Sequence, residues 1–518
     1  MRRFPRLLAG TLAVLAFACG GQDEEQLEGD SAASVAPAAD RQLLEEIQRT
    51  TFRYFWESAH PASGMARERS TSGDTVTTGG TGFGLQAIVV GVERGWISRA
   101  DAYARSLQIA RFLEKADRFD GAWSHWVNGK TAKTIPFGAK DDGGDLVETA
   151  LLLEGLLTSR AYFTLPEEAE LRTLVDSLYR DVDFTAYIHD NALAWHKSPR
   201  DPWQMGVEIR GWNEGLIAYV LALGSPTHPI PTEIYTRGFT GLFGFKNSWF
   251  YGGYQLPLGP AWGGPLFLAH YSFLGMDPRK MADQHAGYWN QVSMHTRINR
   301  AWCVHNAQKD NGYSADLWGL TASDNPGGYF AHSPTDDFGT IAPTAALSSI
   351  AYTPYESLRV ARKLRSMPRA WGPLGFVDAL HPKLGWFDTQ TIAIDQGPII
   401  LMIENYRTGL LWQLGMSAPE VKAGLAKANI AEPDHATGFY LATKDADDDR
   451  LHLVRHPDRG RYEIDLAFQE AGNYQLLLDD RPVWTMGHAK GTERVPFDAS
   501  VGQHTLRLAN RTLKIETH

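Results

Sequence analysis

A helical spacing of apolar residues covers most of this chain and constrains its fold more than any other feature. Between Arg41 and about Lys427, apolar side chains recur at intervals of three and four in roughly twelve segments. The segment Leu216 to Leu223 is apolar on almost every side, so we expect a buried helix there. Many helices without a convincing strand pattern predict an α/α toroid or a helical repeat array. No fixed sequence period of the kind that marks a repeat array is apparent.

The pattern changes after Glu432. In the segment Tyr462 to Phe468, apolar residues alternate with other residues, and shorter segments with the same alternation follow it. Period-two alternation with turn signals about every ten residues is typical of a small β-sandwich. We therefore expect a helical domain over residues 41–430 and a β-sandwich accessory domain over residues 431–518. A structural cap is favoured over a carbohydrate-binding module, because the accessory domain holds a single tryptophan.

The first residues predict export from the cytoplasm. Arginines precede the apolar run Leu7 to Phe17, which is too short to span a bilayer and is typical of a signal-peptide core. Small residues directly before Cys19 resemble the bacterial lipobox, in which the cysteine is lipidated; a plain secretory signal cleaved near Ala18 is the alternative. We expect a lipoprotein signal peptide over residues 1–18 and a flexible tether over residues 19–40. The predicted location is the cell envelope, at the outer membrane facing the periplasm or the cell surface.

Charge and cysteine content exclude several classes of function. The net charge of −10 argues against a nucleic-acid partner, because binding phosphates requires a basic surface. Besides Cys19 the chain contains only Cys303, which excludes a cysteine-rich zinc site. A His-Glu-x-x-His motif is absent from the sequence. We predict no metal and no cofactor, and we expect a monomer that contacts the membrane only through its lipid anchor.

Aromatic residues in the expected loops favour a carbohydrate site. Nearly all tryptophans fall in the helical region, and several stand beside glycine, histidine or asparagine. Flat aromatic faces stack on the apolar faces of sugar rings, although a tryptophan can equally fill a helical core. The candidate substrate-binding residues of this kind are Trp123, His125, Trp126, Trp212 and Trp371.

Three groups of carboxyl residues are candidates for catalysis, because glycoside hydrolysis requires two carboxyl groups. Glu214 follows Gly211-Trp212-Asn213 and begins the most apolar helix, where it can be a capping group or an acid whose pKa is raised by burial. Asp395 precedes the apolar run Ile399 to Ile403. The third group crowds the start of another helix, where it can cap the helix or hold a polar substrate. Its members are Asp141, Asp142, Asp145 and Glu148.

A series of motifs in fixed order gives these residues a more specific context. The motifs are Thr51 to Trp56, Thr81 to Leu85, Glu93 to Trp96, Gly121 to Trp126, Glu148 to Leu152, Gly211 to Glu214, Leu223 to Pro229, Trp318 to Ala322, Gly372 to Asp378 and Ile394 to Asn405. Together they resemble the glucoamylase-like domain family, and within it the endo-β-1,2-glucanases of glycoside hydrolase family 144. The resemblance extends from about residue 43 to about residue 425.

The resemblance implies an (α/α)6 barrel, export, and hydrolysis of β-1,2-glucan or its oligosaccharides with inversion at the anomeric carbon. By motif matching, Glu214 takes the position of the general acid and Asp395 that of another acidic residue of the cleft. The chain departs from the family at Glu148, where an aspartate is usual. The additional methylene group displaces the carboxylate, which bears on endo action and on the linkage that is cleaved.

Two alternative functions fit parts of the same pattern. A polysaccharide lyase on an α/α toroid would need a basic site to neutralise uronate groups, whereas the motifs here are acidic and aromatic. A non-catalytic periplasmic glycan-binding lipoprotein would also use aromatic loops. A glycoside hydrolase that acts on a β-glucan is the leading hypothesis.

Overall fold

The structure is a computed structural model. Apart from residues 243–244, 248, 253 and 308–310, it describes residues 38–432, and it also describes residues 452–455, 461–468, 472–488, 491–498, 502–508 and 511–517. The predicted signal peptide, Cys19 and most of the predicted tether lie outside the described residues. Within the described part of the chain, no helix combines the length and apolar character needed to cross a bilayer.

Six of the described helices are buried along nearly their whole length. They are α2 (Thr78–Glu93), α4 (Leu146–Tyr162), α6 (Leu216–Gly224), α8 (Tyr288–Ala301), α9 (Pro343–Leu347) and α11 (Ala393–Arg407). Helix α11 packs against both α9 and α2, α2 packs against α4, and α4 packs against α6. The apolar segment predicted to form a buried helix is α6, and every one of its residues is buried.

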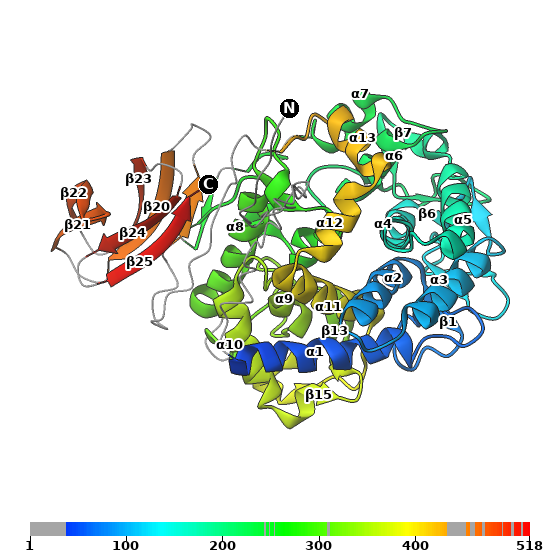
Figure 1. Ribbon diagram of the computed structural model, residues 1–518, viewed down its shortest axis with the longest axis horizontal. Coiled ribbons are helices and arrows are strands. Elements are labelled where there is room, and N and C mark those ends of the chain that lie inside the picture. Colours follow the sequence, from blue (N-terminus) through cyan, green and yellow to red (C-terminus); the bar gives the residue numbers. More distant parts are fainter. Residues whose placement is uncertain are drawn as a thin grey trace, which may run out of the picture.

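The remaining longer helices have one buried face and one polar face. They are α1 (Ala38–Trp56), α3 (Arg99–Leu113), α5 (Ala169–Arg180), α10 (Pro354–Arg365), α12 (Leu410–Ser417) and α13 (Pro419–Lys427), and the short α7 spans Thr232–Ile234. Figure 1 shows the helices arranged around a ring. Buried and amphipathic helices thus combine as the apolar pattern requires, and the predicted α/α architecture is confirmed.

Short antiparallel strands lie in the loops between helices, where the sequence predicted none. Each contains two to four residues, which is too short for a visible alternation. They are β1 (Thr75–Thr77), β2 (Arg118–Phe119), β3 (Ala122–Trp123), β4 (Trp126–Asn128), β5 (Thr134–Ile135), β6 (Gly144–Asp145), β7 (Ile188–His189), β8 (Ala192–Ala194), β9 (His196–Lys197), β10 (Glu208–Ile209), β11 (Phe250–Tyr251), β12 (Tyr254–Gln255), β13 (Ala322–Asn325), β14 (Gly328–Ala331), β15 (Trp371–Gly372), β16 (Gly375–Phe376), β17 (Leu380–His381) and β18 (Trp386–Phe387). The sheets β1-β4-β5 and β10-β8-β7 have three strands, and the others are pairs.

Helices α2 and α4 approach each other closely through glycine. A Cβ atom on Gly82 would lie 2.1 Å from the carbonyl oxygen of Leu151, and one on Gly155 would lie 2.1 Å from the carbonyl oxygen of Gly82. Neither position can therefore carry a side chain without moving a helix backbone. This contact fixes the start of α4 relative to the start of α2, and both helix starts contribute to the candidate site.

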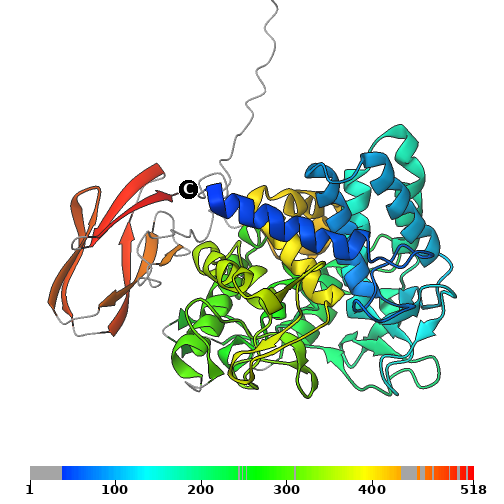
Figure 2. The ribbon, with the colours of Figure 1, turned by 90° about the horizontal axis from the view of Figure 1, so that it is seen from below.

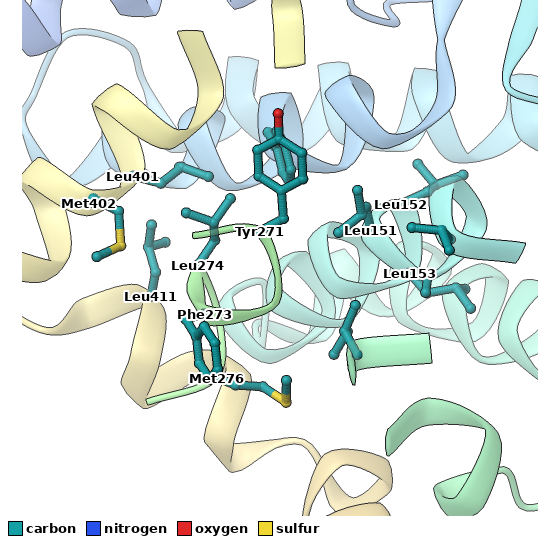
Figure 3. Close-up of a cluster of buried hydrophobic side chains, with 14 of the residues drawn as sticks. Leu151, Leu152, Leu153, Tyr271, Phe273, Leu274, Met276, Leu401, Met402 and Leu411 are labelled. Atoms are coloured by element: carbon teal, nitrogen blue, oxygen red, sulfur yellow. The ribbon is translucent and has the colours of Figure 1, made fainter. Parts of the chain in front are cut away.

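The core contains a junction of four segments, of which α11 and α12 are consecutive in sequence and the others are distant. In Figure 3, leucines 151–153 of α4, Leu401 and Met402 of α11 and Leu411 of α12 surround the segment Tyr271–Met276. Phe273, Leu274 and Met276 are almost completely buried there. The ring of Tyr271 lies at the edge of this cluster, and its hydroxyl oxygen points away from the labelled apolar side chains.

Glu154 is an ionisable residue buried inside this core. Its Oε1 accepts a hydrogen bond from the Gly275 N–H at 3.0 Å, and Gln86 Nε2 lies 3.4 Å from Oε2. Burial raises the pKa of Glu154 to about 8, so its carboxyl group is neutral at pH 7. The neutral form also suits Gln86, whose buried Oε1 has no hydrogen-bond partner among the described residues and could accept that proton after an amide flip.

Replacing Glu154 with glutamine is expected to remove a pH dependence of stability. The pKa in the folded state lies above the usual 4.5, so this carboxyl group favours folding below pH 4.5 and loses that contribution as the pH rises toward 8. The amide does not titrate. E154Q should match wild type near pH 4.5 and unfold roughly 2–4 °C higher at pH 8, as measured by thermal melts. The exposed Glu167→Gln change is the control, and equal melting curves for E154Q and wild type at both pH values would contradict the prediction.

The C-terminal strands form two antiparallel sheets. The first has the order β19 (His452–Arg455), β20 (Arg461–Phe468), β23 (Gly491–Asp498). The second has the order β22 (Arg481–His488), β21 (Gly472–Leu478), β24 (Gly502–Leu508), β25 (Arg511–Thr517). Figure 2 shows these strands beside the helical part and not within it. The predicted change from helices to strands is confirmed, whereas the sandwich packing of the sheets stays a prediction.

Candidate active site

Glu214 lies in the turn that leads into α6. The Ser272 hydroxyl donates a hydrogen bond to the Glu214 carbonyl oxygen at 2.5 Å and accepts one from the Ile217 N–H at 3.1 Å, which fixes this turn. Burial raises the pKa of the Glu214 side chain to about 7, and the negative charges of Asp145 and Glu148 act in the same direction. The carboxyl group therefore retains a proton at a pH where an ordinary glutamate has lost it, which is the state that a general acid needs.

A charged histidine lies between two carboxylates at the start of α4. Asp145 caps this helix through Oδ1, which accepts the Glu148 N–H at 2.9 Å, and its Oδ2 lies 3.3 Å from His125 Nδ1. Glu148 Oε2 accepts the Gly79 N–H of α2 at 2.7 Å, and Oε1 lies 3.9 Å from His125 Nε2. Burial opposes protonation of His125, but Glu148 and Asp145 outweigh it and raise the pKa to about 9. The predicted helix-start cluster thus unites Asp145, Glu148 and His125.

Asp141 and Asp142 are adjacent in sequence but have different surroundings. The pKa of Asp141 is raised to about 7, mainly by burial and then by Asp145, and its Oδ1 lies 3.5 Å from His196 Nε2. Asp142 accepts a hydrogen bond from the Ser198 hydroxyl and pairs with Arg200, both at 2.7 Å. Although burial opposes ionisation of Asp142, these two partners keep its pKa below the usual value. Asp142 therefore connects two loops and has little capacity left for a ligand.

An aromatic rim borders the charged histidine. Phe137 stacks on His125 with ring centroids 4.2 Å apart and contacts Trp126 edge-on at 4.8 Å. The Phe137 side chain is 49% exposed, so one of its faces is available to a ligand. The structure thus brings the predicted residues His125 and Trp126 together with Phe137. Sequence reasoning missed Phe137, because nothing in its local sequence distinguishes it from other loop aromatics.

Two predicted substrate-binding tryptophans belong to the core instead. Trp123 is completely buried, and its indole N–H donates to the Leu113 carbonyl oxygen at 3.1 Å. Trp212 is 5% exposed and stacks on Phe273 at 6.1 Å. Neither ring can present a face to a sugar, so both predictions are wrong. The local sequence was misleading, because nearby glycine, histidine and asparagine residues occur in buried turns as well as in exposed loops.

The structure does not bring the predicted Trp371 to the carboxyl groups through any described contact. The Arg365 guanidinium group lies over its ring, 4.7 Å from the centroid. Phe376 contacts the same ring edge-on, also at 4.7 Å. The ring is half-buried. A role for Trp371 in substrate binding stays a prediction.

Asp395 belongs to a second cluster of carboxyl residues. It lies in the first turn of α11 and interacts electrostatically with Asp378, which is completely buried. Asp378 Oδ2 also accepts the Asp324 N–H at 2.7 Å, and the Asp324 side chain pairs with Arg69 at 2.8 Å. Burial, followed by the charge of Asp378, raises the pKa of Asp395 well above its usual value. Sequence reasoning identified Asp395 but missed Asp378, Asp324 and Arg69, which come from distant segments.

Three sets of side chains in the described part of the chain could hold a cation. In each set the candidate ligand atoms lie within 4.8 Å of one another, and the sets are His125–Asp141–Asp145, His189–Asp190–Glu208 and Asp324–Asp378–Asp388. Protein cations already neutralise part of this charge, since His125 is protonated and Arg69 pairs with Asp324. The predicted absence of a metal stays a prediction.

The carboxyl groups of Glu214 and Asp395 both interact electrostatically with the phenol of Tyr271. Burial raises the pKa of Tyr271 well above its usual value, and the charges of Asp395, Glu214 and Glu148 all raise it further. Glu214 and Asp395 therefore lie on segments that converge around Tyr271. A carboxyl group that holds a proton, a second buried carboxyl pair and an aromatic rim are together suited to acid–base cleavage of a polar, flat-faced substrate.

Comparisons with known proteins agree with this geometry. A family model described as "Putative glucoamylase" matches residues 206–419, which include Glu214 and Asp395. An endo-beta-1,2-glucanase from Chitinophaga pinensis, solved with sophorotriose and glucose, is 46% identical; the match covers 76% of this chain and 99% of that chain, with a TM-score of 0.74. The exo beta-1,2-glucooligosaccharide sophorohydrolase (non-reducing end) of Parabacteroides distasonis is 41% identical over 423 residues, 76% of this chain.

The chain spans 59% of the length of that Parabacteroides distasonis relative. A more distant structure, the endo-beta-1,2-glucanase of Talaromyces funiculosus in complex with sophorose, is 12% identical with a TM-score of 0.53. That match covers 76% of this chain and 93% of the other, and it shows a likeness of fold alone.

Proposed function

This chain belongs to the glucoamylase-like family that contains the β-1,2-glucanases of glycoside hydrolase family 144, and we propose that it hydrolyses β-1,2-glucan or its oligosaccharides. The observation that carries the proposal is the raised pKa of Glu214, which at about 7 lets its carboxyl group hold a proton. The charges of Glu214 and of the buried Asp395 both raise the pKa of Tyr271. The six helices that are buried along nearly their whole length fit the inner ring of the (α/α)6 barrel that the resemblance implies.

In the proposed reaction, Glu214 and Asp395 act on opposite sides of the scissile bond. Glu214 donates its proton to the glycosidic oxygen, so that the leaving sugar departs as a neutral alcohol. A water molecule attacks the anomeric carbon from the other face and transfers a proton to Asp395 in its ionised form. One bond to oxygen is broken and another is formed on the opposite face, which inverts the anomeric configuration.

The His125 side of the site is proposed to bind sugar hydroxyl groups. The imidazolium of His125 donates hydrogen bonds, the carboxylates of Asp145 and Glu148 accept them, and Phe137 offers an exposed ring face. The carboxylate of Glu148 reaches the Gly79 N–H of α2, and the aspartate that the resemblance implies at this position would be one methylene shorter. We propose that Glu148 is one of the residues that set the mode of action, since the relatives include both an endo and an exo enzyme.

The direct test is to incubate residues 36–518 with linear β-1,2-glucan and to resolve the products over time. A ladder of short oligosaccharides supports endo action, whereas a disaccharide alone from the first minutes supports exo action. Proton NMR of the first product should show the α-anomer, because inversion converts a β-linkage to an α-hemiacetal. An absence of product over a long incubation would contradict the proposed hydrolysis, and an initial β-anomer would contradict inversion.

We also propose the cellular context that the sequence predicts. A lipid on Cys19 would anchor the mature chain in the outer membrane, facing the periplasm or the cell surface, with the barrel extended on its tether as a monomer. The C-terminal strands would form a β-sandwich accessory domain over residues 431–518. The support is the signal-peptide core, the small residues before the cysteine and the two antiparallel sheets. Mass spectrometry of the mature N-terminal peptide tests the anchor, since an unmodified peptide that begins after Ala18 would exclude it.

A further inference from the structure

Tyr271 combines a fixed ring with an unused hydroxyl group. It belongs to η7 (Tyr271–Phe273), is 7% exposed, and packs against Phe267 and Phe83 with centroid distances of 5.3 and 5.5 Å. Among the described residues its hydroxyl has no hydrogen-bond partner, and it is not one of the polar atoms buried away from solvent. Figure 3 shows the oxygen directed away from the apolar cluster. A buried tyrosine usually pairs its hydroxyl within the protein, so this hydroxyl is available to bind water or a ligand.

The backbone beside Tyr271 is tied directly to Glu214. The next residue, Ser272, donates its hydroxyl hydrogen to the Glu214 carbonyl oxygen and accepts the Ile217 N–H. The bond from Ile217 is buried and the bond to Glu214 is partly buried, and together they hold η7 against the start of α6. The backbone at Tyr271 is therefore held close to the backbone at Glu214.

The ring of Tyr271 is tied through Phe83 to the segment that carries Asp395. A Cβ atom on Gly397 would lie 2.5 Å from the Cβ atom of Phe83, so the first turn of α11 lies directly on the Phe83 side chain. Asp395 is two residues earlier in the same turn. Phe83 therefore touches both α11, which carries Asp395, and the ring of Tyr271, whose neighbour Ser272 is hydrogen-bonded to the Glu214 backbone.

From this arrangement we propose that the Tyr271 hydroxyl binds a sugar hydroxyl group beside the scissile linkage, between Glu214 and Asp395. The inference rests on the proposed hydrolase function and adds a third residue that contacts the substrate. Burial, followed by the charges of neighbouring groups that include Asp395 and Glu214, keeps the phenol un-ionised, so it donates a hydrogen bond to the sugar and can accept one in return. If Tyr271 served only to fill the core, its hydroxyl would have no role and phenylalanine would serve equally well.

The first experiment compares two tyrosine-to-phenylalanine changes. Tyr271→Phe removes a hydroxyl without a described partner, so the melting temperature should stay unchanged while kcat/KM falls about 10- to 100-fold. Tyr179→Phe is the matched control, because that hydroxyl donates to the Leu221 carbonyl oxygen at 2.8 Å and serves the core alone. It should lower the melting temperature and leave kcat/KM unchanged. Wild-type kcat/KM in Y271F would overturn the inference while leaving the hydrolase function intact.

The second experiment identifies the contact from the substrate side. Monodeoxy analogues of a short β-1,2-gluco-oligosaccharide are assayed with wild type and Y271F. For the analogue that lacks the hydroxyl bound by Tyr271, wild type should slow to the rate of Y271F, and Y271F should lose no further activity. If the loss from Y271F and the loss from the missing hydroxyl added in full for every analogue, the inference would be overturned. If wild type hydrolyses no β-1,2-glucan at all, the proposed function fails, and the inference fails with it.

Discussion

Replacing Glu214 with glutamine is expected to lower kcat for β-1,2-glucan hydrolysis by roughly 10²- to 10⁴-fold. Glutamine has nearly the same shape but cannot donate a proton to the glycosidic oxygen. Within the described structure, the Glu214 side chain makes no hydrogen bond to another side chain, so the melting temperature should change little. Initial rates of reducing-end release measure the effect. The control is Glu208→Gln. Glu208 pairs with His189 in the sheet β10-β8-β7, which precedes Glu214 in the sequence.

The pH profile provides an independent check of the same assignment. The acid form of Glu214 is the active one, so the alkaline limb of the kcat/KM profile should fall as the pH rises through its pKa of about 7. An aryl β-sophoroside has a leaving group that needs no protonation. The loss of rate in E214Q should therefore be much smaller for this substrate than for the glucan. If E214Q hydrolysed the glucan at the wild-type rate, the assignment of the general acid would be wrong.

Local sequence patterns were sufficient to predict the helical architecture. The three- and four-residue spacing located the helices, and the all-apolar segment 216–223 correctly indicated a buried one, because burial on every side leaves no polar stripe. The short strands between helices were missed because two to four residues are too few to establish a period. The close approach of Gly82 to Leu151 was also beyond prediction, since it depends on how two helices cross.

The candidate site was predictable only where one segment carried the signal. Glu214 and Asp395 each precede an apolar run, and Asp145 and Glu148 share a helix start, so all four could be identified locally. Trp123 and Trp212 were wrongly predicted to face the substrate, because the neighbouring residues do not indicate which side of a turn faces solvent. A second set of residues acts through partners from other segments of the chain and has no local signature. They are Arg69, Tyr271, Asp324 and Asp378.

Replacing Asp395 with asparagine should have an effect comparable to that of the Glu214 change, for a different chemical reason. Asparagine cannot accept the proton that the attacking water must lose, so kcat should fall by roughly 10²- to 10⁴-fold while KM changes little. Azide attacks without losing a proton, so it should restore turnover in D395N and yield the α-glycosyl azide. The exposed Asp336→Asn change is the control. An intact kcat with a raised KM would instead make Asp395 a substrate-binding group.

Asp378 allows the role of Asp395 to be separated from its burial. Burial and then Asp378 raise the pKa of Asp395, and a general base is active only when ionised, so wild-type activity should be lost on acidification well above the pKa of an ordinary aspartate, about 4. In Asp378→Asn the amide can donate a hydrogen bond to Asp395 and stabilise its ionised form. The acidic limb of the kcat/KM profile should then move to lower pH, while the alkaline limb set by Glu214 stays in place. An acidic limb that does not move in D378N would show that another group accepts the proton.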